Sequence, residues 1–145
     1  MWRRRAWLAA SAGLLAGCAS ASPRAGAATL RIGVASCADQ DKPQPVWDAV
    51  LAQRPDFFVF AGDNVYASDT PFDIARLRRA YAALAAKDNF ERLRSAVPHL
   101  AVWDDHDYGL NDGGAEFAHK QASKDEFLRF WRVDANDPRR TREGL

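Results

Sequence analysis

Three short apolar segments recur along the chain, and each is bounded by turn residues. Residues 29–35 alternate and then run apolar, while residues 56–61 and 99–103 are continuous apolar runs. Short apolar runs of this kind are typical of buried strands in a parallel sheet. The pattern therefore predicts three parallel strands.

Two helical patterns separate these strands. Residues 45–53 begin with Pro45 at a first helical position, and they place Val46, Val50 and Leu51 on one face. The next helix is expected to begin at residues 70–73, with Thr70 as N-cap and proline after it. Its apolar stripe has helical spacing and comprises Ile74, Leu77, Tyr81 and Leu84.

Two further helices are predicted by capping-box sequences. Residues 88–91 (DNFE) would open a short helix that turns Phe90 and Leu93 inward. A last helix is expected from Ser123, where residues 123–126 (SKDE) form another such box, and it would bury Phe127, Phe130 and Trp131. Strands that alternate with helices favour a right-handed βαβαβ arrangement, so the fold class is α/β with a parallel sheet.

The N-terminal residues have the layout of an export signal. Residues 2–5 are basic, and residues 6–16 form an apolar run that is shorter than the roughly 20 residues needed to span a bilayer. Residues 15–18 (LAGC) resemble a bacterial lipoprotein box in which Cys18 receives the lipid. The three consecutive arginines also look like a twin-arginine signal.

This interpretation divides the chain into a signal (1–17), a tether (18–28) and a domain (29–145), which we expect to be exported and anchored by lipid on the periplasmic side of a bacterial membrane. The alternative is an apolar N-terminal helix packed on the domain, although the glycines and the Ser/Ala/Pro tract argue against it.

Charge and cysteine content exclude other classes. Lysine and arginine total 20 against 19 acids, and a net charge of +1 provides no basic face for a nucleic-acid backbone. Two cysteines cannot form a disulfide framework.

A polar cluster follows each predicted strand, at residues 36–39, 62–66 and 104–109. The carboxyl ends of parallel strands meet at one edge of a sheet, so these clusters would share one pocket. That pocket would hold a thiol, a phenol, an imidazole and several carboxylates, whose mutual repulsion calls for cations. A thiolate and a phenolate suit a transition metal, whereas carboxylate and amide oxygens suit Ca²⁺, Mg²⁺ or Mn²⁺. Two neighbouring metals of different character could clamp a phosphoryl group.

Taken together, the motifs at residues 36–37 (SC), 62–66 (GDNVY) and 103–107 (WDDHD), with YG and ND after them, resemble the alkaline phosphatase D (PhoD-like) family of calcineurin-like metallophosphoesterases. The third motif is the most specific. The resemblance implies hydrolysis of phosphate mono- or diesters with Fe³⁺ and Ca²⁺, while Mn²⁺, Mg²⁺ or Zn²⁺ would also be compatible.

The resemblance also implies roles for individual residues. Asp63 matches the aspartate that bridges the two metals, Tyr66 and Cys37 match iron ligands, Asp105 takes the place of a metal-binding asparagine, and His106 takes that of the catalytic histidine. Four more residues are candidates either for metal binding or for orienting the ligands, namely Asp39, Asn64, Asp104 and Asp107.

The family pattern continues beyond the third motif with more strands and two histidine-bearing metal motifs, and residues 110–145 supply neither. We therefore expect this chain to be the N-terminal part of such an enzyme, with little or no activity by itself. A separately encoded C-terminal half is one candidate partner. The alternative is a truncated, non-catalytic lipoprotein fragment that binds metal.

Structural interpretations compete with these roles. Alone, Cys37 would be a small buried hydrophobe, Tyr66 a cap on the core, and the acids of residues 104–107 a solvated turn. His99 and His119 are expected to be structural.

Overall fold

The computed structural model describes residues 29–145 and contains one parallel sheet. Its strands are β1 (Ile32–Ala35), β2 (Phe57–Ala61) and β3 (His99–Val102), in the order β1-β2-β3. Val34 lies opposite Val59, which in turn lies opposite Leu100. The predicted α/β class with three parallel strands is confirmed.

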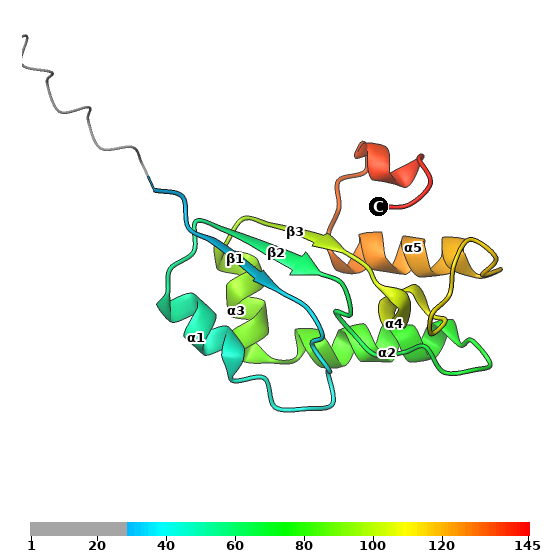
Figure 1. The fold of residues 1–145 in the computed structure, drawn as a ribbon, viewed down its shortest axis with the longest axis horizontal. Coiled ribbons are helices and arrows are strands. Elements are labelled where there is room, and N and C mark those ends of the chain that lie inside the picture. The colour runs from blue at the N-terminus through cyan, green and yellow to red at the C-terminus, as the bar shows by residue number, and fades with distance from the viewer. Residues whose placement is uncertain (1–28) are drawn as a thin grey trace, which may run out of the picture.

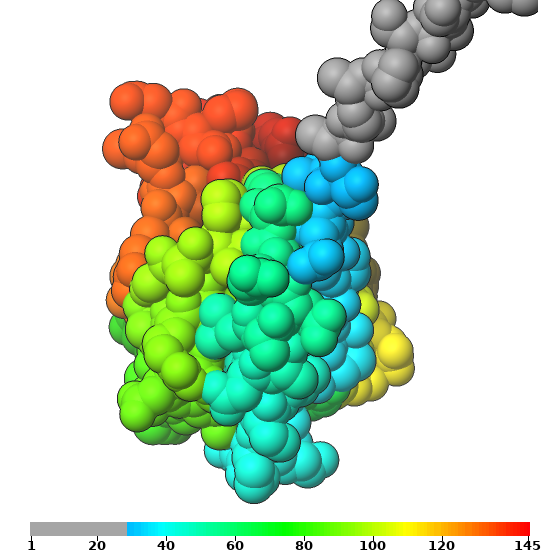
Figure 2. Space-filling model, turned by 90° about the vertical axis from the view of Figure 1, so that its left-hand side faces the viewer, coloured from blue at the N-terminus to red at the C-terminus, as the bar shows by residue number. Residues whose placement is uncertain are grey.

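The helices follow the alternation expected from the sequence. They are α1 (Val46–Ala52), α2 (Ile74–Ala85), α3 (Asp88–Ala96), α4 (Asp105–Tyr108) and α5 (Lys120–Phe130), followed by the short 3-10 helix η1 (Pro138–Arg140). Helices α1 and α3 lie on one side of the sheet (Figure 1) and stand side by side on the face shown in Figure 2.

The core is aromatic and covers one face of the sheet. Phe58 and Phe60 point from β2 into it, and their ring centroids lie 6.1 and 5.9 Å from that of Trp47 on α1. Phe90 on α3 and Trp131, the residue after α5, contact Phe60 at 5.7 and 4.7 Å. Burial of large aromatic side chains on one sheet face therefore fixes the position of α1, α3 and α5.

The opposite face of the sheet carries apolar side chains that are open to solvent. Val34 of β1 is 65% exposed, and Leu100 and Val102 of β3 are 53% and 43% exposed. Ile32 of β1, at 53%, belongs to the same set because side chains two residues apart share a face. The expectation that these strands are buried thus holds for one face of the sheet only within residues 29–145.

Several helices begin at other residues than the sequence predicts. The cap of α2 is Asp73, whose side chain accepts from the Ala75 amide at 2.8 Å, so Thr70 and Pro71 precede the helix. Helix α3 begins at Asp88 itself, and Lys87 occupies its N-cap position. The predicted capping box does not form, because the Glu91 carboxylate accepts hydrogen bonds from Arg94 and Ser95 and does not reach back to the cap.

The remaining differences concern α5 and α1. Helix α5 begins at Lys120, three residues before Ser123. In α1 the buried anchor is Trp47, while Val46 is 49% exposed. The predicted burial of Phe127, Phe130 and Trp131 is confirmed.

The predicted signal, the tether and Cys18 lie outside the described residues. Within residues 29–145, no helix has both the length and the apolar character needed to cross a membrane.

Candidate metal centre

The loops that follow β1 and β2 are joined by backbone hydrogen bonds. The Cys37 amide donates to the Gly62 carbonyl at 3.3 Å, and the Ala38 amide donates to the Asp63 carbonyl at 2.8 Å. Cys37 and Asp63 both have positive φ angles, 59° and 49°, which are uncommon for residues other than glycine. The pairing of the two strands therefore continues into the loops and brings these two side chains together.

Gly62 allows the β2 and β3 loops to approach closely. Its φ of 96° favours glycine, and a Cβ at this position would lie 2.7 Å from the Cβ of Asp104. A residue with a side chain would therefore push Asp63 away from the loop that carries Asp105 and His106.

Asp63, Asp105 and His106 offer ligand atoms that all lie within 4.8 Å of one another. Two further side chains join this group through Asp63: the Cys37 thiol lies 3.7 Å from Asp63 Oδ2, and the Tyr66 hydroxyl donates to the same oxygen at 3.3 Å. The structure thus places three of the ligands suggested by the sequence (Cys37, Tyr66 and Asp105), together with His106, around the fourth, Asp63.

The donors around Asp63 suit a cation. Asp63 Oδ1 is buried and has no hydrogen-bond partner among the described residues, which is rare for a carboxylate oxygen unless an ion or water meets it. Burial and the neighbouring Cys37 and Asp63 raise the pKa of the Tyr66 phenol. The phenol therefore stays protonated in the isolated protein, and a cation is what would make it a phenolate ligand.

His106 is held by two contacts. Its Nδ1 lies 2.6 Å from the Ser68 hydroxyl, and its ring lies over that of Tyr66 with 4.3 Å between the centroids. These contacts fix the plane of the ring, and Nε2 has no hydrogen-bond partner within residues 29–145. Ser68 was not singled out in the sequence, since a serine in a loop carries no motif.

Asp105 is oriented by the loop that follows α4. The Asp112 amide donates to Asp105 Oδ2 at 2.7 Å, and this bond holds the pKa of Asp105 below its usual value. The carboxylate is therefore ionised at neutral pH, as a metal ligand must be.

Asn64 and Asp104 each donate hydrogen bonds to Asp107 next to the cluster. Asp107 is fully buried and accepts from the Asn64 amide at 3.1 Å, from the Asn64 side chain, and from the Asp104 amide at 2.6 Å. Asn64 also donates to the Val102 carbonyl at 2.8 Å, while Asp104 caps α4. Burial raises the pKa of Asp107 to about 7. The contacts of Asn64 and Asp107 orient the loops, and Asp104 is also exposed beside the cluster.

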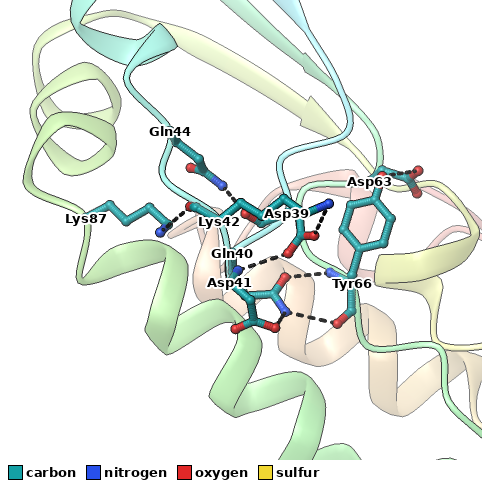
Figure 3. A network of polar contacts seen from close by, with 8 residues as sticks. All are labelled: Asp39, Gln40, Asp41, Lys42, Gln44, Asp63, Tyr66 and Lys87. Carbon is teal, nitrogen blue, oxygen red and sulfur yellow. Dashed lines mark hydrogen bonds and ion pairs between the residues drawn. The ribbon is translucent and has the colours of Figure 1, made fainter.

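Asp39 faces a neighbouring network (Figure 3) and has a depressed pKa, because it accepts from the Asp41 amide at 3.0 Å and pairs with Lys42 at 3.0 Å. Next to it, the buried Gln40 exchanges two hydrogen bonds with the backbone of Tyr66, at 2.8 and 3.1 Å. Gln40 therefore sets the position of Tyr66, a role that no sequence motif indicated.

His99 and His119 lie away from the cluster. His99 packs against Phe60 and Trp131, and the His119 ring stacks on Phe72 with 4.9 Å between the centroids.

A parallel α/β sheet with carboxylate, thiol, phenol and imidazole groups at its carboxyl edge offers the donors that a metal-dependent hydrolase uses. A family model for PhoD-like phosphatases matches residues 32–130, more than half of the chain, and includes every residue of the cluster. The chain belongs to the PhoD-like phosphatase family. No curated protein and no solved structure shows a significant match to it.

Proposed function

We propose that this chain supplies one side of a two-metal centre that hydrolyses phosphate mono- or diesters. The observation that carries the proposal is the convergence of Cys37, Tyr66, Asp105 and His106 on Asp63, whose buried Oδ1 has no partner in the described part of the chain. Membership of a phosphatase family supports the phosphate ester as substrate.

The chemistry of the donors divides them between two ions. Cys37 and Tyr66 are the soft and phenolic ligands that would hold Fe³⁺, Asp105 is an oxygen ligand that would hold Ca²⁺, and Asp63 would bridge the two. When bound, the metals would polarise the phosphoryl group and activate water for attack.

His106 would act on the leaving group. Its contacts with Ser68 and Tyr66 hold the ring, so that Nε2 is available to protonate the departing oxygen of the ester.

We further propose that the uncovered apolar face of the sheet packs against the additional strands of a complete phosphatase domain, on the same chain or on a separately encoded half. Val34, Leu100 and Val102 support this, because exposed apolar patches of this kind mark contact surfaces. Residues 29–145 alone would then show little or no turnover.

We also propose that the chain is exported and receives a lipid at Cys18, which would hold the enzyme on the periplasmic side of a membrane. A Cys18→Ala variant should fail to incorporate labelled fatty acid in bacterial cells. Labelling equal to that of the unaltered protein would contradict the anchor.

Metal binding is tested by titrating the purified chain with Fe³⁺ and Ca²⁺ and measuring metal content and visible absorption. A phenolate bound to Fe³⁺ gives a charge-transfer band, so we expect such a band in the unaltered chain and its loss in Tyr66→Phe. Tyr81→Phe is the matched control, because the buried Tyr81 hydroxyl has no partner among the described residues. Absence of bound iron, or a band that persists in Tyr66→Phe, would contradict this assignment.

Catalysis is tested by adding the remainder of a PhoD-like domain to this chain, either in co-expression or as a longer chain. Phosphatase activity should appear, and His106→Ala should lower kcat by about 100-fold, the lower end of the contribution of a general acid. Failure to gain activity or metal would favour the alternative, a non-catalytic metal-binding fragment.

A further inference from the structure

A pocket of about 900 Å³ lies beside the candidate metal centre and is lined on one side by Asp104, Asp105 and Asp112. Its other side is formed by the start of α5 and by residues 140–144, which lie beside α5 at the C-terminal end of the chain (Figure 1). The volume is within the range of sites that hold small molecules. The pocket is therefore large enough for a substrate that extends away from the metals.

Four cations line this second side, and none forms an ion pair within the described residues. Lys120 donates to the Ala115 carbonyl, Lys124 to the Arg142 carbonyl, and Arg140 to the carbonyls of Val133 and Asp134. The Arg142 side chain is exposed to solvent. Glu143 also lines the pocket and forms no ion pair within the described residues. We call Lys120, Lys124, Arg140 and Arg142 the basic wall.

The cations of the basic wall differ from most other cations of residues 29–145, which form ion pairs. Arg78 and Arg129 pair with Glu126, and Arg94 and Arg132 pair with Glu91. Lys124 is 5% exposed and still has only a carbonyl as partner. Lys124 is therefore a buried cation without a carboxylate, whereas Lys120, Arg140 and Arg142 are exposed. Backbone carbonyls hold a cation without neutralising it, so the charge of Lys124 stays available to an anionic ligand.

We propose that the basic wall is an anion subsite, so that the substrate is a phosphate ester whose alcohol part carries a second anionic group. This inference rests on the proposed function, because the acidic side of the pocket must hold the metals and the reacting phosphoryl group. The second anion is either a phosphate or a carboxylate, both of which match guanidinium and ammonium donors.

The subsite is tested first without metal. Inorganic phosphate and, separately, succinate are titrated by calorimetry into the full chain in the presence of a chelator. At least one should bind saturably, and Arg142→Gln should weaken that binding about 10-fold, as expected for the loss of one charge-assisted bond. Lys120→Gln should act in the same direction, and Arg54→Gln, a change at the opposite end of β2, should have no effect. The anion that binds identifies the second group.

The bridging role is tested with chain that the titration above has shown to hold Ca²⁺. Ethylene glycol bisphosphate should bind more tightly than ethyl phosphate, and Arg142→Gln should remove the difference. Lack of saturable anion binding, equal effects of Arg142→Gln and Arg54→Gln, or equal affinity for the two esters would each overturn the proposal. The chelated experiment does not depend on metal binding, so it separates a failure of the subsite from a failure of the metal centre.

Discussion

At the scale of single residues, the candidate centre is built on two strained positions. Cys37 and Asp63 hold positive φ angles without being glycine, and such conformations persist only where the surroundings enforce them. The backbone bonds between the β1 and β2 loops do so here. The strain is thus located at two of the side chains that we propose as metal ligands.

Asp107→Ala should destabilise the fold, because it removes the acceptor of the buried Asn64 donors and of the Asp104 amide. We expect a loss of about 3 kcal/mol in the free energy of unfolding, measured by urea denaturation. Asp125→Ala, an exposed position on α5, is the control and should change stability by less than about 0.5 kcal/mol. A loss no larger than that of the control would contradict the structural role of Asp107.

The effect of Asp107→Ala should also depend on pH. Without metal, the folded protein keeps the Asp107 proton up to about pH 7, whereas the unfolded chain loses it near the usual value of 3.8. The folded state therefore binds more protons in this window, and the stability contributed by Asp107 falls as the pH rises through it. In the presence of a chelator, the difference in the free energy of unfolding between the wild type and Asp107→Ala should accordingly shrink from pH 4 to pH 7 and stay constant above pH 7.

At the scale of elements, β2 serves both the core and the site. Phe58 and Phe60 anchor its covered face, and the chain then turns at Gly62 to present Asp63. The location of the strands was predictable, since apolar runs between turn residues define them. The helix caps were less predictable than the strands. Asp73 caps α2 because of the path of the preceding loop, and the residues Thr70 and Pro71 do not indicate that path.

Gly62→Ala should damage the centre and the fold together. The new Cβ would lie 2.7 Å from that of Asp104, and alanine is strained at a φ of 96°. We expect a loss of about 2 kcal/mol in the free energy of unfolding, on the order of the cost of left-handed backbone plus this clash, and at least 10-fold weaker metal binding.

Gly144→Ala is the matched control, because its φ of 73° is also positive but its Cβ would meet nothing within 4 Å. Metal titration and denaturation of both variants therefore separate the effect of backbone strain at a positive φ from the effect of the close approach between the β2 and β3 loops. Equal metal affinity in the two variants would show that the approach of the β2 and β3 loops does not position the ligands.

The candidate site was predictable to a similar degree. Parallel strands bring their carboxyl ends together, so Cys37, Asp63 and Asp105 could be grouped from the order of the motifs alone. The roles of Gln40 and Ser68 could not be predicted. Gln40 forms hydrogen bonds with Tyr66 and Ser68 with His106, and each pair is far apart in the sequence and meets only in the folded chain.

At the scale of the whole molecule, the described residues have one covered and one open sheet face. Val34 and Leu100 lie on the open face, on strands that flank Val59 of β2. An apolar surface of this kind attracts other apolar surfaces in water, including those of further copies of the chain.

The isolated chain should therefore self-associate, and the double substitution Val34→Glu with Leu100→Glu should suppress this association. The double substitution should lower the free energy of unfolding by no more than about 1 kcal/mol, because both side chains are more than half exposed. Sedimentation velocity over a range of concentrations measures the association. Substitution of Val46→Glu on α1, which is also exposed but lies on another element, is the control. A monomeric wild type at all concentrations would contradict the prediction.

The bonded group next to the centre has a consequence for how the protein acquires its ions. Asn64 and Asp107 join the loops after β2 and β3 through the protein's own hydrogen bonds, with no cation required. Most of the conformational entropy of these loops is therefore lost on folding, before any ion arrives. An incoming ion would meet ligands that are already ordered, so its affinity would reflect coordination chemistry and very little of the free energy of folding, the reverse of a zinc finger.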